Sequence, residues 1–265
     1  MNAPAGLESE LEDIRREIDA IDDGLMSLLE RRFAATDRVR AIKSKHGSLA
    51  SSPFRPAREA AILRRLLARA ESHVSPDFLV RLWRVILTGS SQNQAPITIH
   101  VSKRLNSAMG NRLRIRDHFG TLPVEEYRDE AQALMQVNAS PGDICIVETE
   151  APWADAFADG KSGEAQIIAS LPMLREDPIP KLLVFGHALA ETTGDDETLL
   201  ISEGKLPRDF AFVPLWQIKN GTRRVSCLPG FLSDHESPFV GLARSNPKLG
   251  LKIAGRYPSP LEVRK

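Results

Sequence analysis

Residues 12–45 read EDIRREIDAIDDGLMSLLERRFAATDRVRAIKSK, and this stretch decides the fold of the first part of the chain. Its apolar residues recur in alternating steps of four and three, at Ile14, Ile18, Ile21, Leu25, Leu28, Ala35, Val39 and Ile42. This heptad pattern predicts one long amphipathic helix with an apolar seam. The seam is broken at Arg32, where a buried guanidinium is costly unless an anion meets it. We therefore expect the helix to hold a small anion as well as to pack.

Two further cations, Lys43 and Arg15, lie on or beside the seam. Lys43 follows Arg32 by about three turns, so the two residues share a helix face to within roughly 20°. Arg15 lies on the order of 42 Å from Lys43 along the axis, so it can reach such a site only from a second, antiparallel helix. A helix on the order of 50 Å long also overhangs a small domain. We expect a dimer with sites shared between chains; the alternative is an ordinary coiled-coil helix with solvated basic residues.

Composition excludes several classes of function. The 265 residues carry 35 basic and 35 acidic side chains, so no overall charge favours nucleic acid or an anionic membrane. The two cysteines, Cys145 and Cys227, have neither metal-ligand spacing nor a disulfide framework and are expected to be buried thiols. The first residues lack a secretory signal, and the longest apolar run, near residues 182–190, is too short to span a bilayer. The chain is expected to be soluble and cytoplasmic.

Two shorter helices should complete the first 95 residues. The second begins with Pro56 at its first helical position and is expected to run to about Glu71. The third is expected to begin after Ser75, a residue type that caps helix N-termini, and Pro76 follows it at the first helical position. Its apolar stripe continues into two hydrogen-bonding side chains, Ser90 and Gln94, which lie four residues apart on the same side of the helix. The alternative for this end is a polar terminus that leads into a linker.

From Pro96 onward, short β-rich runs alternate with helical patterns such as residues 130–136. The expected strands are Ile97–Val101, Asp143–Val147, Lys181–Phe185, Thr198–Ile201, Phe210–Leu215 and Leu251–Ala254. The alternation predicts an α/β or α+β domain at residues 96–265. The sequence contains neither a glycine-rich phosphate loop nor a serine nucleophile elbow.

The polar residues of the three helices form one pattern, made up of Ile14-Arg15-Arg16-Glu17-Ile18-Asp19-Ala20-Ile21-Asp22, Leu28-Leu29-Glu30-Arg31-Arg32, Ile42-Lys43, Arg58-Glu59, and Ser90 with Gln94. Across about 80 residues this pattern resembles the all-helical class of chorismate mutases. It implies an all-α, three-helix domain at residues 1–95 that forms an intertwined helical homodimer. The substrate would be chorismate, a dicarboxylate that rearranges to prephenate in phenylalanine and tyrosine biosynthesis.

The resemblance also implies a role for each residue. Arg15 of the other chain and Arg32 would grip the two carboxylates, with Arg58 and Ser90 supporting them. Lys43 and Gln94 would donate to the ether oxygen as it gains negative charge, and Glu59 would accept a hydrogen bond from the ring hydroxyl. The reaction is a concerted [3,3] shift, so neither a metal nor another cofactor is expected. Arg55 departs from the family, which often has an acidic residue there, and a related helical subclass cleaves isochorismate to salicylate and pyruvate.

Helical mutases of this pathway are commonly fused to a prephenate dehydratase, and residues 251–258 and 142–149 look faintly like parts of one. The Thr-Arg-Phe motif of that family is replaced by residues 191–197, ETTGDDE. We therefore expect a diverged, non-catalytic relative at residues 96–265. Three hypotheses follow: a dimeric chorismate mutase with an accessory domain, a bifunctional mutase and dehydratase, or a non-enzymatic protein that dimerises through the long helix.

Overall fold

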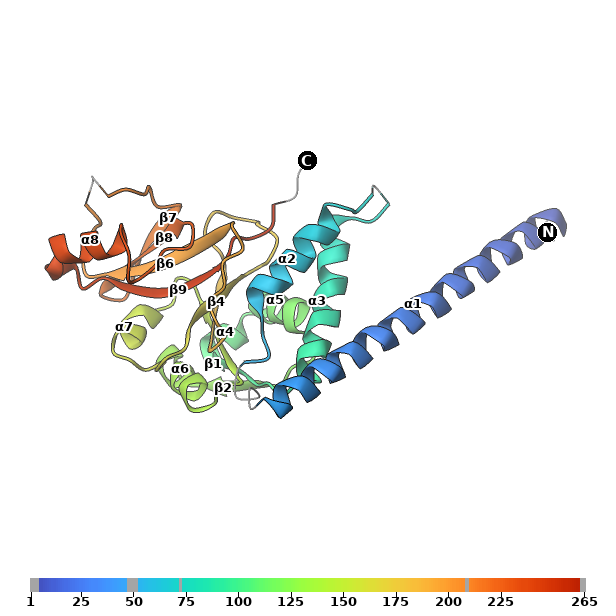
Figure 1. The fold of residues 1–265 in the computed structure, drawn as a ribbon, viewed down its shortest axis with the longest axis horizontal. Coiled ribbons are helices and arrows are strands. Elements are labelled where there is room, and N and C mark those ends of the chain that lie inside the picture. Colours follow the sequence, from blue (N-terminus) through green and yellow to red (C-terminus); the bar gives the residue numbers. More distant parts are fainter. Residues whose placement is uncertain (1–4, 47–51, 72, 208–209, 263–265) are drawn as a thin grey trace. The chain divides into compact units, whose positions relative to one another are not determined.

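The computed structural model describes residues 5–46, 52–71, 73–207 and 210–262, and the chain divides into two compact units, Met1–Ser48 and Leu49–Lys265. The first unit is the helix α1 (Ala5–Lys45), coloured blue in Figure 1. The long helix predicted from the heptad pattern is confirmed. Its seam residues Ile14, Ile18, Ile21, Leu25 and Leu28 are each more than 50% exposed. An apolar stripe of this length requires a partner surface in water.

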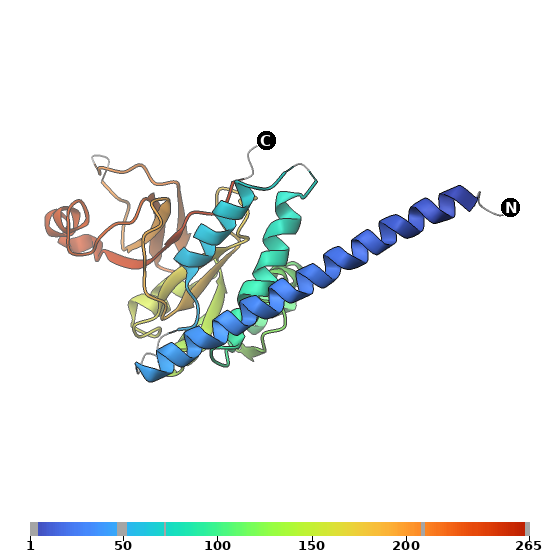
Figure 2. The same ribbon diagram turned by 45° about the vertical axis from the view of Figure 1, so that its right-hand side comes forward.

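The second unit begins with two helices, α2 (Pro56–Leu67) and α3 (Pro76–Gln92), which lie side by side in Figures 1 and 2. Ser75 accepts a hydrogen bond from Phe78 N at 3.2 Å, so the predicted start of α3 is confirmed. The second helix ends at Leu67, not near Glu71. Both helices belong to this unit because Leu63 and Val80 pack with Leu261, near the end of the described chain. The domain boundary between residues 95 and 96 stays a prediction.

Among the described residues, a nine-stranded mixed sheet forms the centre of the second unit. In chain order the strands are β1 (Ile99–Ser102), β2 (Val124–Tyr127), β3 (Ile144–Glu148), β4 (Gln166–Leu171), β5 (Leu182–Gly186), β6 (Asp196–Ser202), β7 (Trp216–Asn220), β8 (Arg223–Pro229) and β9 (Lys252–Pro258). Their spatial order is β2-β1-β3-β5-β4-β9-β6-β8-β7. Strand β1 pairs in parallel with both β2 and β3, whereas β3 to β5 and β6 to β9 are antiparallel pairs. The fold class predicted from the sequence, helices followed by an α/β part, is confirmed.

Alternate residues of the central strands face two separate cores. Cys145 and Val147 of β3 pack with α6 (Glu130–Ala139) and α7 (Trp153–Ala158). Ile144 and Ile146 face the other side, where α4 (Lys103–Ser107) and α5 (Met109–Phe119) cover the sheet. This alternation is the period of two expected for a strand buried on both faces. A last helix, α8 (Phe239–Ser245), and the 3-10 turn Pro247–Leu249 precede β9.

One predicted strand, Phe210–Leu215, is wrong. These residues follow an irregular path, and Phe210 and Phe212 pack on a small core around Leu200 and Leu228. The apolar run therefore covers a core as a loop, and the strand β7 begins at the next residue, Trp216. Among the described residues, no helix combines the length and the apolarity that crossing a membrane requires.

Candidate functional site

Three of the seven predicted site residues, Arg15, Arg32 and Lys43, lie on α1. Arg15 is exposed and lies 3.6 Å from Glu12, one turn earlier. Arg32 lies in a shallow groove whose walls come from α1 itself. The groove is lined by Leu28, Arg31, Arg32, Ala34 and Arg38. Three guanidinium groups along two turns of helix create a positive potential that attracts a small anion.

Arg31 and Arg38 were not among the residues predicted from the sequence. Their signal was present, because Arg31, Arg38 and Arg32 fall within the stretch where basic residues replace the acidic ones of the first half of the helix. Both side chains are exposed, whereas the heptad argument selects residues that interrupt the apolar seam. The heptad argument therefore does not identify exposed cations, such as Arg31 and Arg38, that lie beside the seam.

The other four predicted residues, Arg58, Glu59, Ser90 and Gln94, belong to the second unit. Arg58 and Glu59 are consecutive in α2, so their side chains leave the helix about 100° apart. Arg58 is exposed, while Glu59 is 8% exposed. Ser90 is buried and donates to Ile86 O at 2.7 Å, and Gln94 donates to Ser90 O at 3.2 Å. The first contact lies within α3, and the second ties Gln94, two residues beyond the end of α3, to its last turn.

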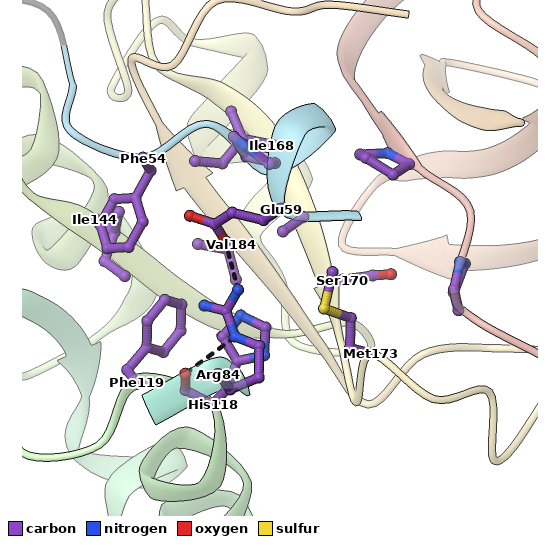
Figure 3. A pocket seen from close by; sticks show the side chains of 14 residues that line it. Phe54, Glu59, Arg84, His118, Phe119, Ile144, Ile168, Ser170, Met173 and Val184 are labelled. Atoms are coloured by element: carbon purple, nitrogen blue, oxygen red, sulfur yellow. Dashed lines mark hydrogen bonds and ion pairs between the residues drawn. The ribbon is translucent and has the colours of Figure 1, made fainter. Parts of the chain in front are cut away.

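Glu59 forms an ion pair with Arg84 of α3, which is 2% exposed. Figure 3 shows the two side chains facing each other, with Phe54, Phe119, Ile168 and other apolar side chains around them. The remaining space is a cavity of about 30 Å³, which is enough for about one water molecule. Burying a carboxylate in such apolar surroundings is costly unless a cation such as this guanidinium meets it.

Arg84 is in turn held by the end of α5. Its Nε donates to the carbonyl oxygen of His118 at 3.3 Å, and Thr88 Oγ1 donates to the same oxygen at 3.2 Å. The guanidinium carbon lies 6.0 Å from the ring centre of Phe119. Burial, and secondarily the charge of Arg84, hold the pKa of His118 well below its ordinary value. The imidazole is therefore neutral, and Glu59 is the group that balances Arg84.

Arg84 was not predicted from the sequence, although the sequence contained a signal for it. Arg84 follows Val80 by four residues and precedes Leu87 by three, which places it within the buried stripe of α3. Glu59 occupies a comparable place in the buried stripe of α2, between Ala57 and Ala60. Opposite charges on the buried faces of neighbouring helices are expected to pair.

Residues 192–196, part of the stretch expected from the sequence to stand in place of a dehydratase motif, form a closed turn. The carboxylate of Asp196 accepts hydrogen bonds from Thr192 Oγ1, Thr193 N and Thr193 Oγ1 at 2.7–2.8 Å, and from Gly194 N at 3.2 Å. Asp196 is 4% exposed. Its acceptor sites are thus used within the turn, and the arrangement is structural.

No group of three or more histidine, cysteine, aspartate or glutamate side chains that could hold a metal ion occurs in the described part of the chain. Cys145 and Cys227 are buried free thiols, as predicted. Burial raises the pKa of both thiols. Thiolate chemistry at these positions is therefore disfavoured.

One comparison with known proteins concerns the three helices. Residues 14–95, about a third of the chain, match the family model of chorismate mutase type II. No curated protein matches the chain. A solved structure described as "GqqA- a novel type of quorum quenching acylases" aligns with 11% identity and a TM-score of 0.42, covering 61% of this chain and 95% of that chain.

Prephenate dehydratase from Streptococcus mutans aligns with 12% identity and a TM-score of 0.37, covering 64% of this chain and 100% of that chain. The family match includes all seven predicted site residues, from Arg15 to Gln94. The family model thus places a chorismate mutase type II match on residues 14–95, and an α/β part follows it.

Proposed function

We propose that the protein is an isomerase that converts chorismate to prephenate at a site shared between two copies of the chain. The observation that carries the proposal is the family match over residues 14–95, which spans the whole predicted polar set. The α1 groove with its arginines supports it, because the substrate is a dicarboxylate. The pathway it serves is the synthesis of phenylalanine and tyrosine.

The reaction needs positioning and electrostatic stabilisation and no proton transfer. Arg15 of the second copy and Arg32 hold the two carboxylates, with Arg58 and Ser90 supporting them. Lys43 and Gln94 donate to the ether oxygen, whose negative charge grows as its bond breaks. Glu59 accepts a hydrogen bond from the ring hydroxyl. A rate gain on the order of 10⁶ corresponds to about 8 kcal/mol, which positioning and two donors can supply.

The homodimer is proposed from the exposed seam of α1. Along this helix Leu25 is 54% and Ile42 is 60% exposed, so the apolar stripe needs cover along its whole length. In an antiparallel pair, Arg15 of one helix reaches a position between Arg32 and Lys43 of the other when the two-fold axis passes near Leu25 and Met26. That register buries the seam and completes two equal sites.

We place the enzyme in the cytoplasm, since both cysteines are free thiols and the expected substrate is a small metabolite. The third hypothesis, a protein that only dimerises, predicts that Arg32→Leu stabilises the dimer without loss of function. The mutase predicts that Arg32→Leu or Lys43→Ala abolishes turnover while the dimer stays folded.

The test of the activity is the loss of chorismate absorbance with purified protein, followed by identification of the product. Prephenate as the product supports the proposal. Salicylate and pyruvate from isochorismate would assign the lyase reaction, and phenylpyruvate from chorismate would assign a second activity to residues 96–265. The absence of turnover would overturn the proposed mutase.

Sharing of the site is tested with a heterodimer of two inactive variants. Arg15→Ala and Lys43→Ala chains carrying different tags are coexpressed, and the mixed dimer is purified through both tags. If Arg15 acts across the interface, one of the two sites lacks both groups and the other is intact, so the heterodimer has about half of the wild-type activity. A heterodimer as inactive as its parents would show that Arg15 serves its own chain.

A further inference from the structure

Glu59 is closed off from any ligand as large as chorismate in this structure. The carboxylate is paired with Arg84, and the cavity beside it holds about one water molecule. The walls of that cavity come from the second unit, including Ile144, Ile168 and Val184 of the sheet. A substrate ring does not fit there. Glu59 can therefore meet a substrate hydroxyl only if α2 changes its position on the α/β part.

Both ends of α2 are fastened to the α/β part by arginines. At its start, Arg55 forms an ion pair with Glu191. Near its end, Arg64 donates to Thr193 Oγ1 at 2.8 Å, to Asp195 O at 2.9 Å and to Ser259 O at 3.1 Å. The buried pair of Glu59 with Arg84 lies between these two contacts. A helix of only 12 residues thus has three charged attachments along its length.

The outer attachments are partly solvated, which makes them reversible. The side chains of Arg55 and Glu191 are 43% and 39% exposed, and those of Arg64 and Asp195 are 27% and 68% exposed. Ion pairs with this exposure contribute little and open readily. An open cleft also lies beside Arg64, between the end of α2 and the turn at Gly194. The end of α2 therefore has solvent on one side and room to move.

Release of α2 would free both charges of the buried pair together. Arg84 and Glu59 would both gain water, so neither charge would be left alone in an apolar pocket, which is the arrangement that costs most. Opening of a docked helix end belongs to the low-energy motions of a folded domain. The docked state and the released state then differ in one functional respect, the access of Glu59 to solvent and ligand.

We infer that the α/β part of the chain restrains the mutase by holding α2 docked, with Glu59 withheld in its ion pair with Arg84, and that release of α2 raises activity. The inference rests on the proposed function of residues 14–95 and gives residues 96–265 a regulatory role in it. Arg55 and Arg64 set the balance between the two states through these attachments, and neither is among the residues proposed to hold the substrate.

The test compares Arg64→Ala with Arg65→Ala in the full-length protein. Arg65 is the next residue of α2 and is exposed, so it is a matched control for the loss of one arginine. Arg64→Ala is expected to raise kcat/KM for chorismate by about threefold or more, as a shift of a two-state population does, and Arg65→Ala is expected to leave it unchanged. Hydrogen exchange of the amides of residues 60–67 should speed up in Arg64→Ala, while exchange in β5 stays slow.

A double variant assigns the gain to Glu59. Glu59→Ala combined with Arg64→Ala should show no gain over Glu59→Ala alone, because the released helix then offers no acceptor to the substrate hydroxyl. The inference is overturned if amide exchange in α2 speeds up while kcat/KM stays equal or falls, or if exchange in α2 does not change at all. A wild-type protein without mutase activity would instead refute the proposed function, and the exchange data would still show whether Arg64 holds α2.

Discussion

Arg175 Nη2 lies 2.6 Å from Glu197 Oε1, and this guanidinium balances a carboxylate that is 1% exposed. The second oxygen of Glu197 accepts hydrogen bonds from Tyr257 OH at 3.0 Å and from the thiol of Cys227 at 3.2 Å. The charge of Glu197 is thus fully partnered inside the second unit. Burial, followed by the charges of Cys227 and Glu197, raises the pKa of Tyr257 well above its ordinary value, so the phenol stays a donor.

Arg175→Met should destabilise the protein by about 3–5 kcal/mol, because it leaves the buried charge of Glu197 without its counter-ion. Urea unfolding at pH 7 measures the change in the free energy of unfolding. Arg128→Met is the control, since Arg128 is 78% exposed beside Asp129 and should change this free energy by less than about 1 kcal/mol. Equal effects of the two substitutions would refute the conclusion that the buried charge of Glu197 requires Arg175 as its counter-ion.

His118→Gln should make stability less sensitive to acid. In the folded protein the pKa of His118 is lowered, so the unfolded chain takes up a proton near its ordinary value of about 6.5 while the folded protein does not. The resulting stability is present above that value and is lost as the pH falls below it. Urea unfolding of the wild type and the variant between pH 7.5 and about 5 should give a shallower fall for the variant; parallel curves would contradict the assignment.

Gly255→Ala should disturb the junction of β4 and β9. A Cβ atom at Gly255 would lie 2.1 Å from the carbonyl oxygen of Ile167. Ile167 and Gly255 are paired across β4 and β9, so the clash can be relieved only by separating the two strands. We expect a loss of about 2 kcal/mol or more in the free energy of unfolding. Gly142→Ala is the control, because its nearest atom would be 3.9 Å away. Thermal unfolding that shows no difference between these variants would argue against close approach of the strands.

Gln94→Glu should make mutase activity depend on pH. A carboxylate at this position repels the developing charge on the ether oxygen at neutral pH, which should lower kcat by about a hundredfold. Activity should recover as the pH falls toward the pKa of a glutamate, about 4.3. Gln92→Glu introduces the same charge at an exposed position two residues earlier and should retain the wild-type profile. A flat profile for Gln94→Glu would remove Gln94 from the mechanism.

Leu25→Asp should dissociate the proposed dimer. The residue lies on the apolar seam near the expected two-fold axis, where two copies of the new carboxylate would face each other. Ser27→Asp adds the same charge on the opposite face of the helix and should leave the dimer intact. Sedimentation velocity over a range of concentrations distinguishes the two outcomes. Dissociation by both substitutions, or by neither, would contradict an interface along the seam.

The helices could be predicted because their signals are local. The heptad spacing of α1 and the cap of α3 at Ser75 need only neighbouring residues, and both were correct. Strands such as β3 and β5 were found because they are apolar runs buried on both faces. The edge strand β2 was not predicted, because its residues are largely exposed and show no apolar pattern. Its place in the sheet depends on pairing with β1.

The candidate site likewise contains residues that could be predicted from a local pattern and residues that could not. The cations of α1 could be predicted because Arg32 breaks a periodic pattern within one helix. The partner of Glu59 could not, because the choice of Arg84 depends on how α2 and α3 pack on each other and on α5. The apolar run that begins at Phe210 is predicted as a strand, but it is a loop. A loop that covers a small core is as apolar as a buried strand, so the sequence does not distinguish the two.

The position of β9 has a consequence for biosynthesis. Among the described strands it is the last in the sequence, yet it lies between β4 and β6 and joins β2-β1-β3-β5-β4 to β6-β8-β7. During translation the first five strands can assemble early, but the edge of β4 stays unpaired until β9 has left the ribosome. Completion of the sheet is therefore a late event, and a nascent chain that pauses before Lys252 exposes an open edge to other chains.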